Sequence, residues 1–418
     1  IQGTAPGAQL VVQSLINAAG GLGGIPPDLT DLFEPPYRTD GARVHTNSWG
    51  PVSPGLPYDQ SARELDDFVW NNPDLVICFA AGNAGTDGDG DGAVDPAQIG
   101  SQSAAKNCIT VGASESVRRE VEPTFATYGS LRPGDFPNAP IHDDPMADNA
   151  EGMAAFSSRG PTQEGRFKPD VVAPGTSILS THSRRAPAAK ATFGTSKDPD
   201  YFFDSGTSMA TPLVAGCAAV VRESLVTNGM ATPSAALVKA LLINGAIELT
   251  GQYSPSEAGP SFNSSSGWGR VDLAGSIILP GPNQNGGFGE GGPLEQGADD
   301  PIVISVPREV AGNTVAANVS AADAAPEPFA GQGVTFKITL VWTDPPGDTL
   351  QNDLDLVVVA SDGTERHGNM GTRRDFDRSN NVEQVAWSNM PPGDATVHVR
   401  AHRITLHPQP YAYAWRIS

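Results

Sequence analysis

The sequence predicts an α/β protein, in which a parallel sheet with helices on both faces is followed by an antiparallel β-sandwich or jelly-roll domain. Two patterns lead to this prediction. Up to about residue 280, short apolar runs alternate with helix-like segments, as in parallel strands covered on both faces. From residue 301 to 418, apolar and polar residues alternate, as in antiparallel strands with one solvated face. The glycine- and proline-rich residues 281–300 separate the two patterns, and we expect them to form a linker.

The elements of the first region follow from the pattern of their residues. Apolar runs are expected to form strands at 10–14, 42–49, 75–81, 107–112 and 171–174. Helices are expected at 59–70, 96–106, 209–226 and 233–245. In the last helix, Thr232 is the expected N-cap, Pro233 takes the first helical position and Gly245 marks the end.

The second region alternates most clearly in the segments 334–342, 396–401 and 411–415. Turn-forming residues at 361–363 and 391–394 fall between these segments. Short alternating strands joined by turns pack as two facing sheets, which predicts the sandwich or jelly roll.

Composition excludes several classes of protein. The chain has 47 acidic and 26 basic residues, a net charge of −21, which argues against binding to nucleic acid or anionic membranes. The longest apolar runs are too short to span a bilayer. The three cysteines, Cys78, Cys108 and Cys217, lie in apolar runs and are expected to be buried free thiols. A Cys78–Cys108 disulfide is the alternative if their strands are neighbours.

The most specific local pattern is Ser205-Gly206-Thr207-Ser208-Met209-Ala210-Thr211-Pro212. Gly206 permits a tight turn, after which Thr207 and Ser208 open a helix. The Ser208 hydroxyl is therefore expected near the positive end of the helix dipole, where developing negative charge is favoured. A second interpretation is that Ser208 only caps the helix.

This segment is similar to the nucleophile motif of subtilisin-like serine proteases. Further blocks resemble that family in the same order, at 80–85, 156–161 and 168–175. The segments 20–24, 46–50, 267–271, 340–344, 352–356 and 380–383 resemble the KP-43 group of alkaline subtilases, in which a jelly roll follows the protease domain. The resemblance implies a partial subtilisin-like catalytic domain at 1–280 and a jelly-roll domain at 301–418.

The resemblance also implies the roles of individual residues. Ser208 is expected to attack the peptide carbonyl, while the Asn83 side chain and the Ser208 backbone amide bind the oxyanion. Two edges are expected to hold the substrate backbone, and a pocket with small walls is expected to admit large apolar side chains. The residues are Gly21, Leu22 and Gly23 on one edge, Ser48, Trp49 and Gly50 on the other, and Ala80, Ala81 and Gly82 in the pocket.

A serine nucleophile needs a base, and the base needs a group that orients it. In this family an Asp motif and a His-Gly-Thr-His block precede every segment matched here, and the 418 residues contain neither. None of the seven histidines is expected to replace the missing one. We therefore expect a fragment whose partner is an N-terminal segment carrying Asp and His, inactive and poorly soluble without it.

Four aspartates interleaved with glycines predict a calcium site. They are Asp87, Asp89, Asp91 and Asp95. The spacing is typical of the first half of an EF-hand loop, although the twelfth position is Gln98 instead of glutamate. A solvated acidic loop is the alternative. Asp353 and Asp355 in the second region form a weaker candidate for Ca²⁺.

Three functions are compatible with these patterns. The favoured one is a secreted, calcium-stabilised serine endopeptidase that hydrolyses proteins and peptides. The second is a pseudoprotease that keeps the cleft and binds peptides without cleaving them. The third is a structural or adhesive role carried by the β domain.

Overall fold

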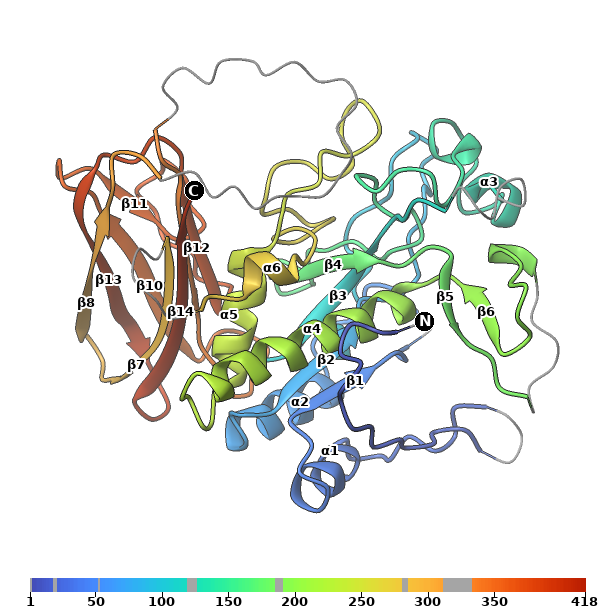
Figure 1. The fold of residues 1–418 in the computed structure, drawn as a ribbon, viewed down its shortest axis with the longest axis horizontal. Helices are drawn as coiled ribbons and strands as arrows, with labels where there is room; N and C mark the ends of the chain where they lie inside the picture. Colours follow the sequence, from blue (N-terminus) through green and yellow to red (C-terminus); the bar gives the residue numbers. More distant parts are fainter. Residues whose placement is uncertain are drawn as a thin grey trace.

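The computed structural model describes residues 2–17, 21–51, 53–118, 126–184, 191–279, 285–310 and 333–418. The helices are α1 (Thr30–Arg38), α2 (Gln60–Asn71), α3 (Tyr128–Leu131), α4 (Thr207–Thr227), α5 (Ala235–Gly245) and α6 (Leu273–Ser276). Short 3-10 helices lie at Gln102–Ala104, Ile141–Asp143 and Ala191–Phe193. The chain folds into an α/β unit followed by a β-sandwich, as predicted (Figure 1).

The first unit is built on a parallel sheet in the order β1-β2-β3-β4. Its strands are β1 (Val44–Asn47), β2 (Val76–Ala80), β3 (Ile109–Ser114) and β4 (Val171–Pro174). A separate ribbon pairs β5 (Ile178–Thr181) with β6 (Tyr201–Asp204). Helix α4 crosses the sheet and contacts all four strands, so its N-terminus is fixed relative to the strand ends (Figure 1).

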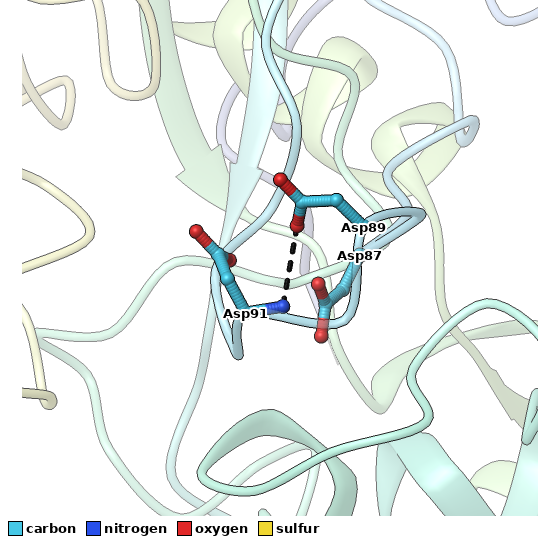
Figure 2. A group of neighbouring side chains, drawn as sticks. All are labelled: Asp87, Asp89 and Asp91. Carbon is cyan, nitrogen blue, oxygen red and sulfur yellow. Dashed lines mark hydrogen bonds between the residues drawn. The ribbon is translucent and has the colours of Figure 1, made fainter.

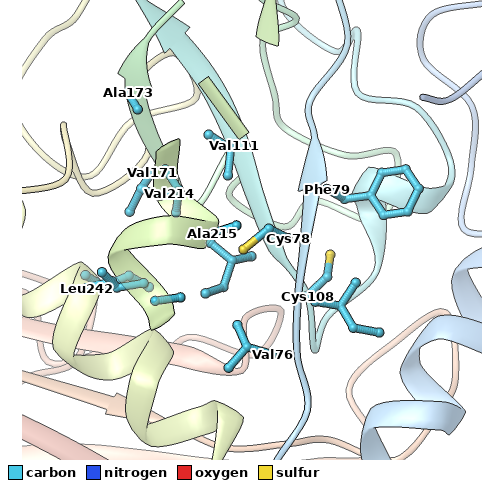
Figure 3. Close-up of a cluster of buried hydrophobic side chains, with 14 of the residues drawn as sticks. Val76, Cys78, Phe79, Cys108, Val111, Val171, Ala173, Val214, Ala215 and Leu242 are labelled. Atoms are coloured by element: carbon cyan, nitrogen blue, oxygen red, sulfur yellow. The ribbon is translucent and has the colours of Figure 1, made fainter. Parts of the chain in front are cut away.

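Apolar side chains from the sheet, α4 and α5 form one core (Figure 3). Val76, Cys78 and Val111 from the strands face Val214 of α4 and Leu242 of α5 in this core. All three cysteines are buried and free, which confirms the prediction and excludes the Cys78–Cys108 disulfide. By length and composition α4 could cross a membrane, the single such helix in the described part of the chain, but here it packs on the sheet.

The second unit consists of two antiparallel four-stranded sheets, ordered β11-β10-β13-β8 and β12-β9-β14-β7. The strands are β7 (Gly286–Leu294), β8 (Asp299–Val306), β9 (Phe336–Val341), β10 (Asn352–Val359), β11 (Glu365–His367), β12 (Val382–Trp387), β13 (Gly393–Ile404) and β14 (Gln409–Ile417). A second apolar core, which includes Phe336, Trp342 and Leu356, contains residues of both sheets. The predicted sandwich is therefore present.

The predicted linker at 281–300 is wrong for its described part, because residues 286–294 form β7. Tyr411, Tyr413 and Trp415 of β14 pair with Gly291, Gly289 and Gly287 of β7. A Cβ atom on Gly291, Gly289 or Gly287 would lie 2.3, 2.7 or 2.6 Å, respectively, from the nearest atom of the paired aromatic side chain. The glycines therefore give the large rings room in a strand, which their composition alone does not indicate.

Smaller differences also have local causes. Residues 10–14 form no strand, and their apolar side chains Leu10 and Val12 are 84% and 85% exposed. Helix α5 begins at Ala235 because Ser234, instead of Thr232, accepts the capping hydrogen bond from Leu237. The helix expected at 96–106 is absent except for a single 3-10 turn at Gln102–Ala104. Helix α1 was not predicted.

Polar contacts buried between the two units join them. The Lys106 ammonium lies 2.5 Å from Asp344 and donates to the Pro345 and Thr349 carbonyls, and both charged side chains are 0% exposed. Asn107 exchanges hydrogen bonds with the Asp344 backbone. Because a buried charge without a partner is costly, these contacts require the two units to stay together.

Candidate active site

Ser208 lies at the N-terminus of α4, directly after the turn at Gly206. Gly206 has a φ of +155°, a conformation that side chains other than glycine rarely adopt. The Ser208 hydroxyl is half-buried and donates to the Ser48 carbonyl at 3.4 Å. Pro212 is the sixth residue of α4. Since Pro212 has no N–H, the Ser208 carbonyl is free to accept the Ser48 hydroxyl at 2.9 Å.

Asn83 follows β2 and is held on both sides. Its side-chain oxygen accepts hydrogen bonds from the Thr207 amide at 2.9 Å and the Thr207 hydroxyl at 3.0 Å. Its backbone carbonyl accepts a hydrogen bond from the Arg132 guanidinium at 3.1 Å. Since the oxygen is bound by Thr207, the amide nitrogen Nδ2 is the end of the side chain left to donate.

Two hydrogen-bond donors converge beside Gly206. A Cβ atom on Gly206 would lie 3.3 Å from Asn83 Nδ2 and 3.6 Å from the Ser208 backbone nitrogen. Both nitrogens therefore border the space that a side chain at residue 206 would occupy. An oxygen atom that carries negative charge could accept from both donors in that space.

The predicted substrate residues divide into two groups. Ser48, Trp49 and Gly50 follow β1 and reach Ser208 through the two Ser48 hydrogen bonds. Gly21, Leu22 and Gly23 are exposed. Their loop contacts Asn17 and Leu15, so the described structure does not bring these three residues to Ser208.

The three residues predicted to line the pocket do not line the cavity that the structure shows beside Asn83. Ala80 and Ala81 are buried and Gly82 is half-buried. The cavity has a volume of about 290 Å³ and is walled mainly by residues between β3 and β4, together with Asn83, Phe193 and Ser205.

In the part of the chain that the structure describes, the Ser208 hydroxyl donates to the Ser48 carbonyl oxygen, which is not a base. His45 lies on β1 but hydrogen-bonds to the side chains of Gln13 and Asn47. Burial lowers the pKa of His45 to about 4. His45 is therefore engaged with side chains other than that of Ser208.

A pair of carboxyls near the cavity, of which Glu115 is buried and Asp144 is half-buried, was not predicted. The hydroxyl of Tyr128, a cavity residue, donates to Glu115 at 2.5 Å, and the hydroxyl of Tyr253 donates to Asp144 at 2.6 Å. Gln252 donates to both carboxyls. Burial raises the pKa of Glu115 well above its usual range and that of Asp144 to about 6. Each residue is ordinary on its own, and only the fold brings them together.

This pair predicts a pH-dependent contribution to stability. The folded state raises the pKa of Asp144 from 3.8 to about 6, so the stabilisation is complete below the lower value and is lost as the pH rises through the higher one. The Asp144→Asn variant lacks this loss. Its free energy of unfolding, relative to the parent, is expected to rise by up to about 3 kcal/mol between pH 4 and pH 7.5 in urea titrations. A parallel pH dependence in both proteins, or the same rise in the exposed control Asp143→Asn, would contradict the assignment.

The predicted calcium loop brings three of its four aspartates together. Oxygens of Asp87, Asp89 and Asp91 lie within 4.8 Å of one another, the single such group of metal-binding side chains in the described residues (Figure 2). Asp87 is 1% exposed, and its Oδ1 atom has no hydrogen-bond partner. Asp95 is not in the group, because its carboxylate accepts a hydrogen bond from the Gly88 amide.

The weaker metal candidate has a different counter-charge. The Arg378 guanidinium contacts both Asp353 at 3.2 Å and Asp355 at 2.5 Å. The two carboxylates lie on one strand, β10, and are almost fully buried. An arginine therefore takes the place that we expected for a metal ion.

Comparisons with known proteins agree with this geometry. The profile of the Subtilase family, peptidase S8, matches residues 1–269. The chain is 27% identical over 457 residues to the serine protease/ABC transporter B family protein tagD of Dictyostelium discoideum, covering 87% of this chain and 24% of that protein. It is 36% identical over 171 residues to the serine protease AprX of Bacillus subtilis, covering 41% of this chain and 30% of that protein.

Among solved structures, the fold is similar to fervidolysin from Fervidobacterium pennivorans, a keratinolytic enzyme related to subtilisin. The TM-score is 0.40 at 19% identity, covering 88% of this chain and 38% of that chain. The chain spans about a quarter to a third of the length of the two curated relatives. Because the family profile covers well over half of the 418 residues, this protein belongs to the Subtilase family of serine peptidases.

Proposed function

We propose that the protein is a serine endopeptidase that hydrolyses peptide bonds through an acyl-enzyme. Ser208 Oγ attacks the carbonyl carbon, and the oxyanion that forms is bound by Asn83 Nδ2 and the Ser208 amide. The observation that carries the proposal is the convergence of these two donors on the open space at Gly206, next to the Ser208 hydroxyl. The Thr207 contacts support it, because they hold the Asn83 amide in place before substrate arrives.

The base in this proposal comes from a segment outside the 418 residues. Two observations support this: the Ser208 hydroxyl donates to a carbonyl, which cannot take up its proton, and His45 is engaged elsewhere. Strand β1 is also an edge of the parallel sheet, and Gln13, whose side chain contacts His45 of β1, follows the exposed apolar residues Leu10 and Val12. A further strand of the same protein could cover both.

The test compares turnover of fluorescently labelled casein by the chain alone and by the chain together with the segment encoded upstream. The endopeptidase proposal expects turnover with the segment only, and loss of turnover after treatment with a fluorophosphonate. Saturable peptide binding without turnover in the presence of a segment that carries Asp and His would favour the pseudoprotease instead.

We also propose that the loop of Asp87, Asp89 and Asp91 binds Ca²⁺. The observation in favour is Asp87 Oδ1, a buried carboxylate oxygen without a partner, since such an atom is costly unless a cation or donor meets it. The loop follows Asn83 closely along the chain, so the ion would order the segment that carries the oxyanion donor. Calcium and the acidic surface together support an extracellular location.

Removal of calcium is expected to lower the melting temperature. At a free Ca²⁺ concentration of one hundred times Kd, binding stabilises the folded state by about 2.7 kcal/mol. Differential scanning fluorimetry with Ca²⁺ and with EDTA measures the difference, which Asp87→Asn should abolish and the exposed control Asp40→Asn should keep. Equal melting temperatures in Ca²⁺ and EDTA would refute the site.

A further inference from the structure

The proposed oxyanion donor, Asn83, is an exposed residue in a turn at 82–85 that follows β2. Contacts with the segment at 156–158 hold the two ends of this turn. The Gly82 carbonyl accepts a hydrogen bond from the Ser158 amide at 3.0 Å, and the Gly85 amide donates to the Phe156 carbonyl at 2.9 Å. Neither of these two contacts involves the peptide group that directly follows Asn83.

The peptide group between Asn83 and Ala84 is bound on both of its sides. Its N–H, which belongs to Ala84, donates to the Ser158 hydroxyl at 3.1 Å. Its carbonyl oxygen, which belongs to Asn83, accepts from Arg132 Nη1 at 3.1 Å, and in the described part of the chain Arg132 is the one donor to this oxygen. Because a peptide group is planar, bonds on both sides fix its orientation, and with it the direction of the Asn83 side chain.

Arg132 is itself held by the segment at the end of α3. It is the C-cap residue of this helix, and its Nε atom contacts the Asp135 carboxylate at 2.6 Å, which leaves Nη1 for Asn83. Tyr128 and Phe136 on either side are buried in the apolar core, with ring centroids 5.6 Å apart. The guanidinium also lies 5.7 Å from the centre of the Phe136 ring. The position of Arg132 is therefore set without substrate.

The charge of Arg132 does not face the space beside Gly206. It is paired with Asp135, both side chains are more than a third exposed, and its further hydrogen bond goes to a backbone carbonyl. Solvent and the carboxylate screen such a charge, so a direct effect on the oxyanion is small. What the geometry permits is an effect that passes through Asn83.

We propose that Arg132 is a positioning residue for the peptidase reaction. By binding the Asn83 carbonyl, it keeps the Asn83 side-chain amide in the orientation that meets the oxyanion. This inference rests on the proposed function and adds a residue that lies outside every motif of the sequence.

Kinetics of a labelled peptide with the upstream segment present give the first test. Arg132→Ala is expected to lower kcat about tenfold with KM unchanged, because a displaced donor loses part of its effect on the transition state. In the Asn83→Ala background the same substitution should change kcat by less than about twofold, since no amide is left to position. The control Arg38→Ala, an exposed arginine that also has a carboxylate partner, should keep kcat.

Hydrogen exchange of the 418-residue chain alone, read by mass spectrometry, gives a test that needs no turnover. The Thr207 amide lies in the first turn of α4, where the helix offers it no acceptor, and it donates to Asn83 Oδ1. Arg132→Ala and Asn83→Ala are expected to speed exchange of this amide about tenfold, as for the loss of one hydrogen bond. Arg38→Ala should leave it unchanged.

The two measurements separate the positioning role from the peptidase function. Turnover by the parent with unchanged kcat or unchanged Thr207 exchange in Arg132→Ala would overturn the positioning role and leave the function standing. Equal losses of kcat from Arg132→Ala in both backgrounds would also overturn it, because the effect would not pass through Asn83. If the parent showed no turnover but Arg132→Ala sped the exchange, the peptidase proposal would fall and the hold of Arg132 on Asn83 would stand.

Discussion

Replacement of Ser208 by alanine is expected to lower kcat by roughly 10⁶-fold, a magnitude measured on subtilisin itself. The variant loses the nucleophile, so no acyl-enzyme can form. Asn83→Ala keeps the nucleophile but removes one of the two donors beside Gly206, and should lower kcat by about 10²- to 10³-fold, also a subtilisin value. Both are measured as initial rates of peptide hydrolysis with the upstream segment present.

A control variant on the same helix as Ser208 accompanies the Asn83→Ala measurement. Ser224→Ala removes a hydroxyl from the same helix, α4, at a position far from its N-terminus, and should leave kcat unchanged. If Asn83→Ala raised KM and kept kcat, Asn83 would bind the ground state equally and would not stabilise the transition state. That result would contradict the role given to Asn83.

Lys106→Met is expected to destabilise the whole chain by about 3–5 kcal/mol. It leaves the Asp344 carboxylate buried between the two units with no ammonium partner, and burial already raises the pKa of that carboxyl. Lys106→Met/Asp344→Leu removes both charges and should recover much of the loss. Urea unfolding of the full chain, followed by tryptophan fluorescence, measures each free energy.

An exposed ion pair serves as a control that separates the effect of burial from the effect of losing a charge. Arg38 and Glu34 form an ion pair with side chains 61% and 56% exposed, so Arg38→Met should cost less than about 1 kcal/mol. Equal costs for Lys106→Met and Arg38→Met would show that the contact between the units adds little stability. In that case the β-sandwich would be an independent domain and not a support for the catalytic unit.

The fold could be predicted where the pattern of one segment decides its structure. The strands β2 and β3 are mostly apolar and buried at every residue because both faces of the sheet are covered, and α2 has Asp59 at its N-cap. Strand β7 could not be recognised in this way. Its glycines favour a linker, and their reason is the row of rings on β14, more than 100 residues away. Alternating glycines opposite alternating aromatics were the signal that was missed.

The site residues also fall into those that the sequence predicted and those that it did not. Ser208 and Asn83 were predicted because each lies in a specific motif, and the structure joins them through Thr207. Arg132 and the carboxyl pair lie outside any motif, so only the tertiary structure places them near Asn83 or the cavity. The calcium role, the KP-43 resemblance and the origin of the base stay predictions.

Labelling with a fluorophosphonate, read by intact mass spectrometry under denaturing conditions, tests the central claim most directly. This reagent reacts with a serine that a base has activated. The chain with its upstream segment should gain one adduct, at Ser208, and the Ser208→Ala variant should gain none. An unlabelled chain in the presence of a segment that carries Asp and His, or an adduct on another serine, would contradict the account.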